Sequence, residues 1–352
     1  MKKMLTLACA IILGFFATEA VNAQAAQRNC SAMDVLNQQL EQNPAMIENM
    51  QRIEEHTNEV LNKNEENRIN GVISIPVVVH VIYRTSSENI SEAQIQSQID
   101  VLNKDFRRTN SDADNTWSQA VDSEIEFCMA TVDPNGNATT GITRKSSNKT
   151  SWGTNDAMKS SAQGGVDAWP ADQYLNMWVC NIGNSILGYA QFPGGSASTD
   201  GVVMSPQYFG TTGYVSAPFN LGRTATHVVG HWLNLRHIWG DGACGADDFV
   251  SDTPASDAAN YGCATGHTSC SSVDMVQNYM DYSDDACMNL FTTGQKARMR
   301  ALFDTGGFRA SLVNSNACGS AGPVASCTDG IQNGSETGVD CGGSNCIPCD
   351  VG

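Results

Sequence analysis

Two apolar runs mark the first part of the chain. Residues 5–16 are mostly apolar, follow two lysines and lead to the small-residue site Val21-Asn22-Ala23. This layout is typical of a secretory signal peptide over residues 1–23, with cleavage after Ala23. The second run, residues 73–83, is β-branched and almost wholly apolar. It predicts a strand that is covered on both faces.

The segment between these runs is polar, with apolar residues at helical spacing. Those from Met46 to Ile53 fall on one helical face, which predicts one or two short helices. Residues 62–70 lose this spacing, are strongly polar, and suit a linker or a processing site. We therefore treat residues 24–70 as a separate helical segment and begin the main domain at Gly71.

The main domain mixes helix and strand patterns. Ser91 and Gln94 predict a capping box, and the helix that follows has apolar residues from Ile95 to Phe106 at spacings of three and four. Further strands are predicted at residues 125–132, 175–182, 186–192 and 202–205. A strand, a helix and then several strands indicate an α+β layer.

Regular periodicity ends near residue 240, where the chain becomes rich in Asp, Ser, Gly and Cys. A last helix is expected from Thr293 to about Phe303. Residues 319–323 contain Gly and Pro and predict a linker, and residues 327–349 hold four cysteines. We therefore assign the main domain to residues 71–318. Residues 319–352 form a linker and a cysteine-rich module, held by two disulfides or by zinc.

Charge and cysteine content narrow the functional classes. Acidic residues outnumber basic ones 37 to 20, a net charge of −17, which argues against nucleic acid or an anionic membrane as partner. Past the N-terminal run, no apolar stretch is long enough to span a membrane. Twelve of the 13 cysteines remain after signal cleavage, as expected for a secreted, disulfide-bonded protein.

The strongest chemical signal is a histidine cluster. His227 and His231 are four residues apart, so a helix projects both imidazoles from one face, where they can share one zinc ion. His237 can supply a third ligand if the helix stops soon after Leu233, and Asn234 is well suited to the left-handed turn this requires. Ordinary core histidines in a purely structural exported protein are the alternative interpretation.

This stretch resembles the signature of the metzincin metalloproteases, H-E-x-x-H-x-x-G-x-x-H, in which some members have Asn at the Gly position. More narrowly, the chain is similar to the pappalysin family. Residues 277–282 (Gln-Asn-Tyr-Met-Asp-Tyr) and the block around Phe291-Thr292-Thr293-Gly294 resemble that family's methionine turn and following helix. Further similar blocks are residues 174–180, 188–193 and 251–254, and the likeness covers about residues 72–310.

The resemblance implies a metzincin-type catalytic domain. It consists of a twisted mixed sheet, a zinc-binding helix and an irregular, disulfide-tied C-terminal subdomain with the methionine turn, preceded here by a helical pro-segment. The implied roles are zinc ligation by His227, His231 and His237, an apolar floor at Met280, and a hydroxyl from Tyr282 that contacts the metal or the oxyanion. It further implies disulfides from Cys244 to Cys270 and from Cys263 to Cys287, and makes Asp247, Asp248 and Asp252 candidates for calcium.

One catalytic residue of the family is missing. The general base is the Glu after the first histidine, and here that position is Val228, which cannot carry a proton. Loss of a positioned acid/base typically costs about 10²–10⁴ in rate. Three interpretations remain open: a zinc-binding pseudoprotease, a protease disabled at one codon, or another carboxylate as base, of which Asp241 is nearest in sequence.

Two segments bear on regulation and on binding. Cys30 is a candidate latency ligand for the zinc, or else a structural disulfide partner, for example of Cys318. A bridge between Cys128 and Cys180 is a weaker expectation. Residues 186–192 are either the edge that receives an extended peptide substrate or an ordinary core strand.

Together these features predict a secreted zinc metalloendopeptidase of the pappalysin type, made as a zymogen, that binds peptides or proteins. Its catalytic competence is in question because of Val228. The alternative is a non-catalytic pseudoprotease that contains zinc and binds peptides or proteins in the same groove.

Overall fold

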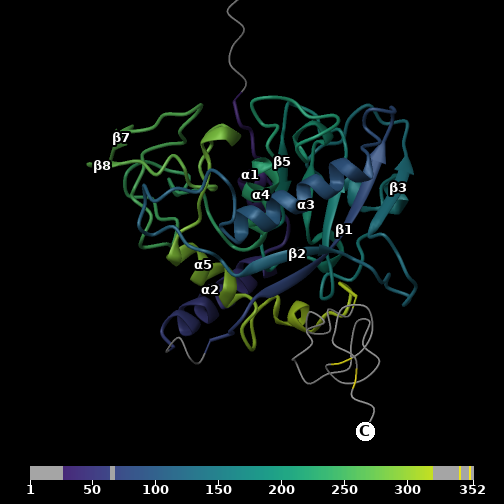
Figure 1. The fold of residues 1–352 in the computed structure, drawn as a ribbon, viewed down its shortest axis with the longest axis horizontal. Helices are drawn as coiled ribbons and strands as arrows, with labels where there is room; N and C mark the ends of the chain where they lie inside the picture. Colours follow the sequence, from purple (N-terminus) through teal and green to yellow (C-terminus); the bar gives the residue numbers. More distant parts are fainter. Residues whose placement is uncertain (1–26, 64–67, 320–340, 342–348, 350–352) are drawn as a thin grey trace, which may run out of the picture.

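The computed structural model describes residues 27–63 and 68–319, together with Cys341 and Cys349 (Figure 1). The predicted signal peptide, and the tail module apart from these two cysteines, lie outside the described residues. No helix in the described ranges is long and apolar enough to cross a membrane.

A mixed sheet forms the centre of the domain, with strand order β2-β1-β4-β6-β5, and β3 pairs with β1 as well. The strands are β1 (Ile73–Tyr83), β2 (Ile125–Met129), β3 (Ile142–Ser146), β4 (Leu175–Val179), β5 (Gly188–Ala190) and β6 (Val202–Met204). β1 runs parallel to β2, β3 and β4, and β5 pairs antiparallel with β6 at the end of this order. A small hairpin, β7 (Thr268–Ser269) and β8 (Ser272–Val273), lies apart from this sheet.

The β1 strand has the bounds that its apolar run predicts, and the structure shows why it is so apolar. Along one edge, the first half of β1 pairs with β2 and the second half pairs with β3. Along the opposite edge, β1 pairs with β4. Nine of its residues, from Ile75 to Ile82 together with Ile73, are buried. The other predicted strands are present but shorter, because their ends enter turns.

The helix after β1, α3 (Glu92–Phe106), begins as predicted but without a full capping box. The Ser91 hydroxyl accepts a hydrogen bond from the backbone N–H of Gln94 at 3.1 Å. The Gln94 side chain donates instead to the carbonyls of Pro206 and Phe209. The reciprocal half of the predicted box is therefore wrong, because Gln94 ties the helix to a distant loop.

Two further α-helices belong to the domain, α4 (Arg223–Trp232) and α5 (Thr293–Ala301). α5 starts with a complete capping box between Thr292 and Gln295. Short 3₁₀ turns lie in the loops at Ala157–Lys159, Ser161–Gln163, Ala197–Thr199, Pro206–Tyr208, Asp285–Cys287 and Ala310–Asn314.

The N-terminal segment forms two helices, α1 (Ala32–Gln42) and α2 (Ala45–Leu61). α1 contacts β5, and α2 contacts α5 (Figure 1). Buried residues of both helices, such as Leu36 and Met46, belong to the same apolar core as the sheet. The segment therefore packs as an integral layer on the domain.

The disulfides match the family-implied pairs and correct two other expectations. Cys244 bonds to Cys270 and Cys263 bonds to Cys287, and Cys341 bonds to Cys349 in the tail. Cys128 bonds to Cys318, 190 residues away, which ties the end of the domain to β2. The expected bridge from Cys128 to Cys180 is therefore wrong, and so is the bridge from Cys30 to Cys318 that was the alternative to a latency role; Cys30 and Cys180 are buried free thiols.

Candidate metal centre

The helix α4 presents His227 and His231 one turn apart and then stops. Its C-cap is Leu233, and Asn234 follows with φ +69°, the left-handed conformation that reverses the chain. The backbone N–H of Leu235 donates back to the Gly230 carbonyl at 3.0 Å. The predicted stop and left-handed turn are thus confirmed, and they return the chain toward the helix at His237.

The three imidazoles converge through one atom each. Nε2 of His231 lies 3.1 Å from Nε2 of His227 and 3.1 Å from Nε2 of His237. Three nitrogens that ligate one zinc ion tetrahedrally at 2.0–2.1 Å would be about 3.3 Å apart. The spacing in the structure is therefore close to that of a zinc site.

Each ring is oriented through its other nitrogen. Nδ1 of His227 is 2.7 Å from the Tyr279 carbonyl, and Nδ1 of His231 is 2.8 Å from the Leu235 carbonyl. Nδ1 of His237 is 2.5 Å from Oδ1 of Asp241. These acceptors place the proton on Nδ1 and leave the Nε2 lone pairs facing one another, which is unfavourable unless a cation lies between them. The residues present therefore fit a metal ion.

Electrostatics keep the first two rings in the form that binds a metal. Burial lowers the pKa of His227 and of His231 well below the usual histidine value, and the neighbouring imidazoles lower both further. Neutral imidazole is the ligating form.

A fourth ligand atom comes from the pro-segment. The Sγ of Cys30 and the three histidine nitrogens all lie within 4.8 Å of one another. Burial raises the pKa of the Cys30 thiol to about 12, so without a cation beside it the thiol stays protonated. The structure thus brings the candidate latency residue to the histidine cluster.

The residues around Cys30 pair with the sheet edge at β5 through an isolated bridge. The backbone N–H of Leu187 donates to the Asn29 carbonyl at 2.9 Å, and that of Ser31 donates to the Gly188 carbonyl at 3.3 Å. Cys30 and Gly188 form a parallel bridge. The edge at residues 186–192 is therefore covered by the chain's own N-terminal segment.

Met280 packs against α4, and Tyr282 contacts the histidine rings. A Cβ added at Gly230 would lie 2.4 Å from Sδ of Met280, so a glycine between the two helical histidines lets this thioether approach α4. The Tyr282 ring lies 4.9 Å from the His237 ring, and its hydroxyl donates to the Cys30 carbonyl at 3.0 Å. Burial raises the pKa of this phenol, so it remains a hydrogen-bond donor.

Val228 is fully buried in the core of the domain, next to the first histidine. Among the described residues, the cluster of metal-ligating groups contains no carboxylate. Asp241, the nearest acidic residue in sequence, contacts Nδ1 of His237 rather than the side that faces the other histidines. Its position is that of a residue that orients a ligand.

The three acidic residues considered for calcium are occupied by hydrogen bonds within the chain. Asp247 accepts from the N–H of Phe249, and Asp248 accepts from Val250 and from Thr253. Asp252 accepts from the Thr292 hydroxyl and the Gly294 N–H at the start of α5. Calcium binding by these residues stays a prediction.

A buried arginine pocket beside the metal cluster was not predicted from the sequence. The Arg28 guanidinium lies 2.7 Å from Oδ1 of Asp285, and both side chains are fully buried. Arg28 also donates to the Ser283 carbonyl and the Thr224 hydroxyl. Its only sequence signal was an arginine two positions before Cys30, at the start of the mature chain.

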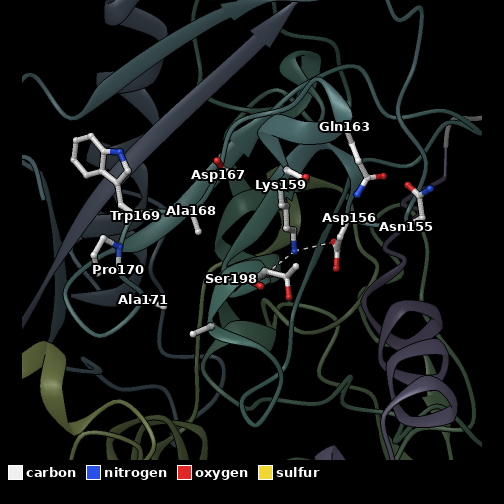
Figure 2. Close-up of a pocket in the computed structure, with 13 residues that line it drawn as sticks. Asn155, Asp156, Lys159, Gln163, Asp167, Ala168, Trp169, Pro170, Ala171 and Ser198 are labelled. Carbon is white, nitrogen blue, oxygen red and sulfur yellow. Dashed lines mark hydrogen bonds and ion pairs between the residues drawn. The ribbon is translucent and has the colours of Figure 1, made fainter.

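A cavity of about 620 Å³ lies elsewhere, lined by residues that include Asp156, Lys159 and Trp169 (Figure 2). Nζ of Lys159 projects into this region but contacts Asp156 at 2.9 Å and the Thr199 carbonyl at 2.7 Å. None of the metal-cluster residues lines this cavity. The polar groups here stabilise the loop and do not extend the metal centre.

Comparison with known proteins identifies related chains. A family model described as pregnancy-associated plasma protein-A, of the M43 peptidases, matches residues 159–304. An extracellular metalloprotease of Pyricularia oryzae is 35% identical over 243 residues, which cover 66% of this chain and 75% of the relative. Extracellular metalloprotease 1 of Coccidioides posadasii is also 35% identical, over 66% of this chain and 77% of its own length.

Solved structures show the same likeness. Mature mirolysin of Tannerella forsythia, in complex with a cleaved peptide, is 50% identical, covers 70% of this chain and 98% of its own, and has a TM-score of 0.68. A promirolysin mutant from the same organism is 45% identical and covers 82% of this chain and 97% of its own, with a TM-score of 0.75. The larger share with promirolysin fits a pro-segment in this chain.

Proposed function

This chain belongs to the pappalysin family of metalloproteases, and from that premise we propose that His227, His231 and His237 hold one zinc ion in a secreted protein with a peptide-binding groove. The convergence of their three Nε2 atoms, with every Nδ1 already engaged, is the observation that carries the proposal. Like its fungal relatives, the chain is an extracellular protein.

Latency is the second part of the proposal. Support comes from the Cys30 thiol, which lies within 4.8 Å of the three histidine nitrogens, and from the Tyr282 hydroxyl, which donates a hydrogen bond to the Cys30 carbonyl. With the pro-segment in place, Cys30 would keep water and substrate away from a bound metal ion. When residues 24–70 leave, the fourth position opens and the Tyr282 hydroxyl becomes free to donate to a substrate oxygen.

The sheet edge at residues 186–192 is the proposed binding site for the peptide backbone. Asn29 and Ser31 already pair with Leu187 and Gly188 through the backbone. Main-chain pairing of this kind accepts many sequences, because the hydrogen bonds do not depend on side chains. We propose that an extended peptide takes this edge once the pro-segment has gone.

Side-chain preference follows from the Arg28 pocket. A guanidinium is buried there against the Asp285 carboxylate and a backbone carbonyl. A buried carboxylate of this kind is costly to leave unpaired. We therefore propose that the pocket accepts a basic side chain of the bound peptide.

Val228 determines whether the protein can hydrolyse a bound peptide. Zinc, when bound, supplies a Lewis acid and lowers the pKa of a bound water. Hydrolysis also needs a group that takes the water proton and passes it to the leaving amine. Val228 offers no lone pair, and Asp241 is on the wrong side of its histidine. These residues favour the non-catalytic alternative, a zinc-containing protein that binds peptides and hydrolyses them very slowly.

The test compares two proteins that differ only at position 228. Hydrolysis of a quenched random-peptide library is measured for the zinc-loaded protein without residues 1–70 and for its Val228→Glu counterpart, each with and without chelator. We expect chelator-sensitive cleavage from the Glu form and a rate about 10²–10⁴ lower from the Val form. Equal, chelator-sensitive rates would show that another group moves the proton.

A further inference from the structure

The carboxylate of Glu54, on α2 of the pro-segment, lies in a set of donors that belong to the domain. Arg298 donates to it through both terminal nitrogens, to Oε2 at 2.8 Å and to Oε1 at a shorter distance. The Asn234 amide donates to Oε1 at 3.2 Å. A bidentate guanidinium with a third donor is the geometry that recognises carboxylates.

The domain itself holds the principal donor in place. Nε of Arg298 donates to the Asn234 carbonyl at 2.7 Å, and its guanidinium lies 5.3 Å from the centre of the Phe249 ring. The Arg298 side chain is 2% exposed, whereas the Glu54 side chain is 27% exposed. The fork of Arg298 is thus oriented by residues that remain when the pro-segment leaves.

A second arginine, Arg236, lies near the Phe249 ring that also packs against Arg298. The Arg236 guanidinium lies 4.9 Å from the Phe192 ring centre and 5.9 Å from that of Phe249. Its Nε is buried and makes no hydrogen bond. Removal of Glu54 takes away the carboxylate that Arg298 contacts directly.

We propose that Arg298 and Asn234 form a carboxylate-binding site of the domain, which Glu54 fills in the pro-form and which takes the acidic side chain of another peptide once Glu54 is withdrawn. The proposal rests on the release of the pro-segment described above but not on zinc chemistry or turnover. The domain would then have a binding site for acidic side chains that is separate from the Arg28 pocket, where Asp285 would bind basic ones.

The experiment uses the full secreted chain and acetate as the probe. Thermal unfolding is followed for wild type and for Glu54→Ala, with sodium acetate or with sodium chloride at equal ionic strength. We expect Glu54→Ala to lower the melting temperature by roughly 2–5 °C. Acetate should restore at least half of that loss, and chloride should restore much less. Glu55→Ala, an exposed neighbour in the same helix, should show neither the loss nor the acetate response.

A second variant separates recognition from screening. Glu54→Ala combined with Arg298→Met removes the fork, and it should lose the acetate response. Equal recovery by acetate and chloride, or an acetate response that survives in the double variant, would overturn the proposal. Bound zinc is measured alongside, because a fall in zinc content would point to failure of the histidine site rather than of the carboxylate site.

Discussion

Asp241 lies behind the third histidine of the cluster: its Oδ1 is 2.5 Å from Nδ1 of His237, while Nε2 of the same ring is 3.1 Å from Nε2 of His231. A carboxylate in this position fixes the orientation of the ring and makes the metal-facing nitrogen a better donor. Asp241, the acidic residue nearest in sequence to the cluster, therefore orients one of the proposed zinc ligands and does not occupy the position of a base.

Replacement of Asp241 by Asn should weaken zinc binding without abolishing it. Mutation of a residue that hydrogen-bonds a metal-ligating histidine typically lowers metal affinity by about 10–100-fold. Competition with a coloured chelator measures the affinity. Asp247→Asn is the matched control, because Asp247 is exposed and caps a turn away from the histidines. Equal zinc affinity in the two variants would contradict the role given to Asp241.

Gly230→Ala should destabilise the domain, although alanine normally stabilises a helix relative to glycine. The added methyl would lie 2.4 Å from Met280 Sδ, so the buried Met280 side chain must shift, at a cost of roughly 1–3 kcal/mol. Chemical denaturation measures the change. In the double variant with Met280→Ala, the combined loss should be smaller than the sum of the single losses, because the clash has gone.

Arg28→Met should loosen the pro-segment. Removal of one partner of a buried ion pair leaves Asp285 without its cation, at a cost of about 3 kcal/mol. Limited proteolysis should then degrade the N-terminal segment faster in Arg28→Met than in wild type. Arg52→Met, an exposed position on α2, serves as the control. Unchanged protection of the segment in Arg28→Met would argue against this anchor.

The sequence predicts the parts of this structure that depend on local patterns. The apolar run gives the bounds of β1, and Asn234 marks the turn that returns the chain to His237. The third strand, Ile142–Ser146, carries Thr, Arg, Lys and Ser after its first residue. It forms because β1 offers it a partner, and no periodicity indicates it.

Long-range pairings were the main failures of sequence reasoning. Cys128 and Cys318 are 190 residues apart, and only the folded sheet brings their chain segments together. The same holds for Arg28 with Asp285 and for Glu54 with Arg298, since charged residues are common and their partners depend on the packing of the pro-segment. The histidine cluster could be predicted because a helix turn and one chain reversal bring His227, His231 and His237 together within a short stretch of chain.

His80 should make the domain sensitive to mild acid. Its ring is fully buried between the Thr143 hydroxyl and the Asn176 amide oxygen, and burial lowers its pKa to about 4. As the pH falls, His80 is therefore protonated in the unfolded chain near pH 6.5, before it is protonated in the folded one. The folding free energy that the neutral ring contributes is present above pH 6.5 and is lost as the pH falls toward 4. The full effect is about 3 kcal/mol. His80→Gln removes the titrating group, so its stability deficit relative to wild type at pH 7.5 should shrink as pH falls from 6.5 to 4. Denaturation curves for zinc-loaded protein measure it, and a deficit that stays constant over this range would show that His80 does not titrate as its burial requires.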